Sequence, residues 1–152
     1  MIWPFRKPKP PPTRPHLSGS AVHSLVVRAL VGKTLPNFRP VIQKSVMACP
    51  PKPMLRRAAD QSFKPWHEDV WECEDQARAL VHQCQLIAAN EGCSWAVGTL
   101  RANAPEGSSH DLHVFVWAIL DLPGGPQFTL FDPTANEWAD VPDLTGVDYV
   151  IT

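Results

Sequence analysis

Three residues between positions 73 and 132 carry side chains that could act together in thiol chemistry: Cys73, His113 and Asp132. The thiolate is the reactive form of cysteine; an imidazole can take the thiol proton, and a carboxylate can orient the imidazole. A helix N-terminus also stabilises the anion through its free N–H groups. These residues predict a catalytic unit with Cys73 as nucleophile, His113 as general base and acid, and Asp132 as the orienting group.

The elements expected around these residues place each of them at an element end. Apolar side chains recur at helical spacing after Cys73, so we expect a helix over residues 73–89. A Pro-Gly-Gly-Pro turn joins two apolar runs into a hairpin, with His113 near the start of one strand and Asp132 at the end of the other. The two side chains can therefore lie close together. The expected strands cover residues 93–102, 112–122, 127–132 and 147–152.

Each of the three residues also has an ordinary structural explanation. A free cysteine is commonly a small buried residue, and Cys84 and Cys93 are read that way. His113 fits a satisfied strand histidine, and His110 is a rival base from the loop before the strand. Asp132 before Pro133 fits a turn starter. Only the order and placement of all three favour chemistry.

A developing oxyanion in such a site would need hydrogen-bond donors. The backbone N–H of Cys73 is one candidate, and three residues upstream of it are the others. The candidates are Gln61, Trp66 and Trp71.

Neither a metal nor a cofactor is expected. Six cysteine and histidine residues fall in one region, but none has the CxxC or HxxxH spacing of a zinc site. They are Cys73, His82, Cys84, Cys93, His110 and His113.

Charge and proline divide the chain into two parts. Residues 1–64 hold twelve of the fourteen Lys and Arg with a single acid, a net charge of +11, and residues 65–152 hold two bases and fourteen acids, a net charge of −12. Twelve of the seventeen prolines lie at or before Pro65. Proline fixes φ and removes a backbone donor. We therefore expect a basic Pro-rich N-terminal arm over residues 1–61, with one or two short helices, and an α+β domain over residues 62–152.

The arm has three readings: a solvated linker, a segment docked on an acidic surface of its own chain or a neighbour, and a nucleic-acid-binding tail. The nearly opposite charges of the two parts make docking on an acidic protein surface at least as strong a hypothesis as nucleic-acid binding. No apolar run is long enough to span a membrane, and no secretory signal is recognisable. Four cysteines without framework spacing indicate reduced thiols, so a cytoplasmic location, or one within a particle, is expected.

The segments CEDQA, HVFVWA and FDPT, in this order, resemble the transglutaminase-like superfamily of papain-like thiol enzymes, and most of all its bacterial cysteine peptidases. The resemblance covers about residues 62–135. It implies a papain/transglutaminase-like core in which one N-terminal helix carries the cysteine and packs on an antiparallel sheet. It also implies acyl transfer from a peptide or protein amide through a thioester on Cys73. Trp71 and Glu72 stand where the bacterial peptidases often have Gly-Asp.

Two functions from different classes follow. The leading prediction is a cysteine peptidase or amidase, with an amine-using transglutaminase as a variant that shares the thioester step. The alternative is a non-catalytic interaction or particle-assembly protein with the same fold, in which the basic arm binds an acidic partner surface or nucleic acid.

Overall fold

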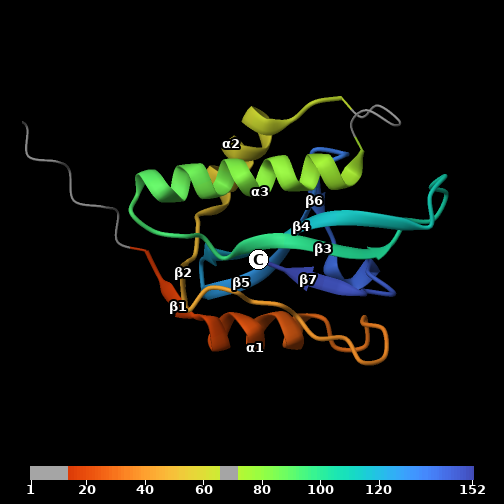
Figure 1. Ribbon diagram of the computed structural model, residues 1–152, viewed down its shortest axis with the longest axis horizontal. Coiled ribbons are helices and arrows are strands. Elements are labelled where there is room, and N and C mark those ends of the chain that lie inside the picture. Colours follow the sequence, from red (N-terminus) through yellow and green to blue (C-terminus); the bar gives the residue numbers. More distant parts are fainter. Residues whose placement is uncertain (1–13, 66–71) are drawn as a thin grey trace, which may run out of the picture.

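A computed structural model describes residues 14–65 and 72–152. Figure 1 shows three layers, with α1 below a central sheet and α2 and α3 above it. The sheet is antiparallel and has five strands in the order β6-β5-β4-β3-β7. Its strands are β3 (Val97–Asn103), β4 (Leu112–Leu122), β5 (Gly125–Asp132), β6 (Glu137–Ala139) and β7 (Tyr149–Ile151).

The central strand β4 is buried along most of its length, and each side of the sheet has its own hydrophobic cluster. Phe115, Trp117 and Ile119 belong to the cluster that includes α1 residues, whereas Val114 and Val116 belong to the cluster with α2 and α3. Alternate residues of a strand point to opposite faces. A strand whose apolar side chains point to both faces therefore lies at the centre of a sheet that is packed on both sides.

The hairpin between β4 and β5 turns at two glycines. Gly124 and Gly125 have φ of 95° and 112°, a region that residues with a Cβ rarely adopt. The turn pairs Val116 with Phe131 and Trp117 with Leu130. This register sets which residues face each other at the far end of the hairpin.

The basic first part of the chain is folded wherever the structure describes it. It forms β1 (His16–Ser18), α1 (Gly19–Ala29), β2 (Val46–Ala48) and α2 (Lys52–Ser62). Ser18 caps α1 by accepting a hydrogen bond of 3.1 Å from the Ala21 N–H. Val22 and Val26 of α1 are fully buried against the sheet.

These elements correct the expected fold class. One helix packed on a sheet was expected, preceded by an extended arm with one or two short helices. In the described residues α1 and α2 of that arm instead pack on the sheet and contribute to its two hydrophobic clusters. The expectation of an extended arm gave too much weight to proline. Pro51 and Pro53 lie at the N-cap and in the first turn of α2, where a missing N–H costs no helical hydrogen bond.

Packing around α2 and α3 completes the upper layer. Leu55, Ala58 and Ala59 of α2 are buried against α3 (Cys73–Asn90), which contributes Leu80 and Cys84 to the same cluster. A 3-10 turn, Val141–Asp143, follows β6. Within residues 14–65 and 72–152, no helix combines the length and apolar character needed to cross a membrane.

Two adjacent residues after α1 test whether the first part of the chain belongs to the core. Leu30 is 1% exposed and Val31 is 73% exposed. Replacing a buried leucine by alanine removes apolar contact and leaves a cavity, so Leu30→Ala should lower the free energy of unfolding by about 2–5 kcal/mol. Val31→Ala should change it by less than about 0.5 kcal/mol. Urea unfolding of both variants measures the difference, and equal effects would contradict the packing described above.

Candidate functional site

The start of α3 presents Cys73 as the first helical residue. Glu72 is the N-cap, and its side chain accepts a hydrogen bond from the backbone N–H of Asp75. In return the Glu72 N–H donates to Asp75 Oδ2 at 3.3 Å, which completes a capping box. This reciprocal pair fixes where the helix begins, and therefore where the thiol lies.

His113 and Asp132 project from the same face of neighbouring strands. Because Val116 pairs with Phe131, Asp132 lies opposite Phe115, two residues along β4 from His113. The His113 Nε2–H donates to Asp132 Oδ1 at 3.0 Å. The two side chains are 13% and 16% exposed, so the bond is largely shielded from water.

Asp132 is itself held by the turn that follows β5. Its Oδ1 accepts hydrogen bonds from the backbone N–H groups of Thr134 at 2.9 Å and Ala135 at 3.2 Å. An aspartate that accepts from residues two and three positions later forms a stable local turn. The turn therefore fixes the carboxylate, and the carboxylate fixes the imidazole.

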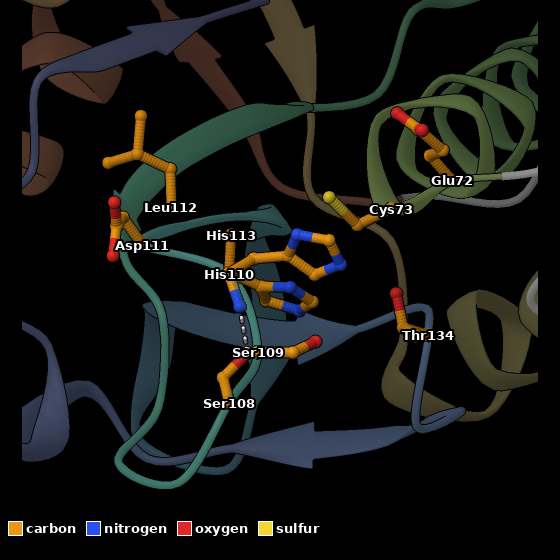
Figure 2. Close-up of a pocket in the computed structure, with 9 residues that line it drawn as sticks. All are labelled: Glu72, Cys73, Ser108, Ser109, His110, Asp111, Leu112, His113 and Thr134. Atoms are coloured by element: carbon orange, nitrogen blue, oxygen red, sulfur yellow. Dashed lines mark hydrogen bonds between the residues drawn. The ribbon is translucent and has the colours of Figure 1, made fainter. Parts of the chain in front are cut away.

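The thiol of Cys73 forms a hydrogen bond with the His113 side chain. Because Nε2 of the ring is engaged with Asp132, Nδ1 is the nitrogen left for the thiol. Figure 2 shows the Cys73 side chain pointing from the start of α3 toward the His113 ring. Helix and hairpin thus bring together the three residues expected from the sequence.

The surroundings of Cys73 favour its ionised form. The bond to His113 lowers the pKa of the Cys73 thiol, and burial acts in the opposite direction. Backbone N–H groups of Val114 and Glu74 also donate to the sulfur and lower its pKa further. Neither donor could be predicted from residue type, because almost every residue has a backbone N–H. The position of Cys73 at a helix start was the one signal for the Glu74 N–H.

His113 and Asp132 each stabilise the charged form of the other. Burial disfavours the imidazolium, but hydrogen bonds to Asp132 and Cys73 outweigh it and raise the pKa of His113 to about 9. Burial likewise opposes ionisation of Asp132, and the bond to His113 more than compensates, so the pKa of Asp132 is lowered. The shifts of His113 and Asp132 favour an imidazolium–carboxylate pair at neutral pH, and the lowered pKa of Cys73 increases its thiolate fraction.

The pH dependence of His113 provides a direct test of this charge state. The ring should titrate near pH 9 in NMR spectra, well above its ordinary value of about 6.5. In Asp132→Asn the midpoint should fall toward that ordinary value, because the charge that stabilises the imidazolium is gone. Asp148→Asn, which removes a carboxylate paired with Arg101 instead, is the control and should leave the midpoint unchanged. An equal shift in both variants would contradict a specific role of Asp132.

A cleft with a volume of about 540 Å³ opens at the thiol. Besides Cys73 and His113 its lining includes Glu72, Thr134 and the loop residues Ser108–Asp111. A loop between β3 and β4 was expected, but its position beside the thiol was not. Its closeness in sequence to His113 was the available signal.

The other sequence candidates lie in different places. The side chain of Gln61 accepts a hydrogen bond from Gln83, ten residues along α3 from the thiol, which corresponds to about 15 Å of helix. Trp66 and Trp71 lie outside the described residues. His110 lines the cleft beside His113, as Figure 2 shows. Of the three oxyanion candidates, therefore, only Gln61 is among the described residues, and it lies away from Cys73.

The pKa values of the other three cysteines are shifted upward, in the opposite direction to that of Cys73. Burial raises the pKa of Cys49 to about 11 and that of Cys84 to about 12. Burial also raises the pKa of Cys93. Among residues 14–65 and 72–152, no group of three or more Cys, His, Asp or Glu side chains is arranged to hold a metal ion.

No family model and no curated protein matches this chain. Solved structures with a similar fold include PSL1a in complex with E64, with 16% sequence identity and a TM-score of 0.70 over 90% of this chain and 51% of that one. They also include the Polyporus squamosus lectin bound to the human-type influenza-binding epitope Neu5Aca2-6Galb1-4GlcNAc, with 16% identity and a TM-score of 0.69 over 90% of this chain and 49% of that one. The shared property is the fold. The chain spans about half the length of these solved chains.

These neighbours correct the family expected from CEDQA, HVFVWA and FDPT. The two structures named above are of Polyporus squamosus lectin, so the assignment to the transglutaminase-like superfamily, with its papain-like core, is wrong. The cysteine peptidase or amidase activity, and the classification as an enzyme, were inferred from that family and are corrected with it. Three short segments were too little sequence to assign a family.

The expected partners are corrected as well. The lectin neighbours give no support to a peptide or protein amide substrate, and one of them binds a glycan epitope. These neighbours likewise give no support to docking of a basic arm on an acidic protein surface or on nucleic acid. In the described part of that arm, Arg14 is paired with Glu91 of the same chain at 2.8 Å and its side chain is 9% exposed.

Proposed function

We propose that this chain carries a nucleophilic thiol site that captures electrophilic ligands covalently at Cys73. The observation that supports it most strongly is the pair of hydrogen bonds on one imidazole, from His113 to Asp132 at 3.0 Å and between His113 and the Cys73 thiol. A thiol that is buried for packing alone has a raised pKa, as Cys84 has. Cys73 has a lowered one and opens on a cleft.

Each residue has a defined part in the proposed reaction. The Cys73 thiolate attacks an electrophilic carbon, the new S–C bond forms, and the bond to the leaving group breaks with its electron pair. The His113 imidazolium donates its Nδ1 proton to a basic leaving group. Asp132 stays ionised and holds the ring through Nε2. Before the reaction, the N–H groups of Val114 and Glu74 stabilise the thiolate.

The compound named in one neighbouring structure offers a first test. PSL1a is known in complex with E64, and under this proposal E64 should occupy the Cys73 cleft of the present chain. Native mass spectrometry of the full chain should show one E64 per molecule. Cys73→Ser should lose the complex, and Cys93→Ser, which changes a cysteine at the other end of α3, should retain it. Equal binding by the wild type and Cys73→Ser would place E64 elsewhere and contradict the proposal.

Glycan binding is a second candidate. Its support is the similarity to the Polyporus squamosus lectin, which is known in complex with Neu5Aca2-6Galb1-4GlcNAc. Isothermal titration of this trisaccharide into the chain tests it, with Galb1-4GlcNAc as the control ligand. Selective heat with the trisaccharide supports the candidate. No heat with either sugar excludes recognition of this epitope by the part of the fold present here.

A further inference from the structure

We infer that the Cys73 cleft selects electrophiles that carry a positive charge, such as an ammonium or guanidinium group. The inference rests on the proposed function and names the class of ligand that this site takes. It follows from the charges that line the cleft and its surroundings.

The lining of the thiol cleft is acidic at its mouth. It includes the carboxylates of Glu72, from the N-cap of α3, and Asp111, from the loop before β4, and both residues are exposed. No Lys or Arg is among the described residues that line it. The positive charge of His113 is already matched by Asp132 and Cys73. The described side chains around the reactive sulfur therefore present a net negative charge to an approaching ligand.

A second cleft, of about 810 Å³, is lined by an earlier part of the same loop. Residues 104–106 line this second cleft, whereas residues 108–111 line the first, and Asp132 connects the two through its bond to His113. The second cleft adds further carboxylates and the ring of Trp138, and again its described lining contains no Lys or Arg. Its acidic residues are Glu106, Asp132, Glu137, Asp140 and Asp143.

Two neighbouring clefts with a net negative lining focus the electrostatic potential and raise the local concentration of cations. At a separation of several ångströms each carboxylate attracts a cation and repels an anion, so the difference between a cationic and an anionic ligand is twice the single interaction. Two carboxylates at the mouth then give a rate ratio of about tenfold at low salt, and added salt reduces it. An anionic electrophile should therefore react slowly at Cys73.

Three methanethiosulfonates of similar size test the inference on the full chain. Aminoethyl methanethiosulfonate is a cation, sulfonatoethyl methanethiosulfonate an anion, and methyl methanethiosulfonate neutral. With each, the thiolate attacks the sulfenyl sulfur, a disulfide forms, and methanesulfinate leaves. Rates at Cys73 are divided by the rates of the same reagents with free mercaptoethanol, which removes intrinsic differences between them.

The normalised cation-to-anion ratio should be about tenfold in the wild type at low salt and should approach one in the double variant Glu72→Gln/Asp111→Asn. Asp121→Asn is the matched control, since it removes one exposed carboxylate at the opposite end of β4 and should leave the ratio unchanged. If the wild-type ratio is near one and the neutral reagent still reacts rapidly, the charge selection is contradicted, but the proposed thiol site is not. A neutral reagent that reacts no faster at Cys73 than at Cys93 overturns the proposed thiol site itself.

Discussion

Iodoacetamide should alkylate Cys73 more than about tenfold faster than it alkylates Cys49 or Cys84 at neutral pH. The pKa of Cys73 lies below 9, whereas those of Cys49 and Cys84 are about 11 and 12. At neutral pH these values give Cys73 at least about a hundredfold more thiolate than Cys49. A more basic thiolate is also a stronger nucleophile, which reduces the expected difference in rate by roughly tenfold. Burial of Cys49 and Cys84, both fully inaccessible, widens the gap again.

The measurement is peptide mapping of alkylated protein by mass spectrometry over a time course. Cys93 provides the internal comparison, because it is partly exposed like Cys73 but burial raises its pKa. It should react more slowly than Cys73 although a reagent can reach it. Uniform labelling of Cys73 and Cys93 would mean that access, and not ionisation, sets the rates, and would contradict the electrostatic account of the site.

His113→Ala should slow alkylation of Cys73 by about tenfold or more at neutral pH. The variant removes the hydrogen bond that lowers the pKa of the thiol most, while burial, which raises it, remains. Each unit of pKa corresponds to a tenfold change in thiolate at a pH well below the pKa. A new space beside the sulfur also lets water in, so the effect should be read from the pH profile of the rate, whose midpoint should move to higher pH.

His82→Ala is the matched control for this variant. His82 is an exposed residue on the same helix, α3, and lies away from the thiol cleft. Its replacement should leave both the rate and the midpoint at their wild-type values. If His82→Ala slows the reaction as much as His113→Ala does, the loss reflects a general disturbance of α3 and the role given to His113 is contradicted.

The sequence predicted those parts of the fold whose signals are local. The helix expected over residues 73–89 spans Cys73–Asn90, because a continuous apolar face and the acids of the first turn both mark it. The strand expected over residues 112–122 spans Leu112–Leu122. A long apolar run next to a Gly-Gly turn is typical of one strand of a hairpin. In the site, the same local signals placed Cys73, His113 and Asp132 at element ends that meet.

What the sequence did not reveal depends on distant contacts. The pairing of β1 with β2 joins His16 to Ala48 across about thirty residues of chain, and each strand has only three residues. A strand that short has too little alternation to be recognised. Burial of Val22 and Val26 depends on the sheet that they cover, which forms from the second half of the chain. Family membership was mistaken for a related reason, since motifs of four to six residues describe a local arrangement and not a whole fold.

The bond to the His113 side chain is the interaction that lowers the pKa of the Cys73 thiol most. Titration of the thiolate by its ultraviolet absorbance, as the difference between the wild type and Cys73→Ser, measures this shift. The midpoint for Cys73 should lie below 9 in the wild type and return to 9 or above in His113→Ala. A wild-type midpoint at or above 9 would show that burial outweighs the bond to His113, and would contradict the account.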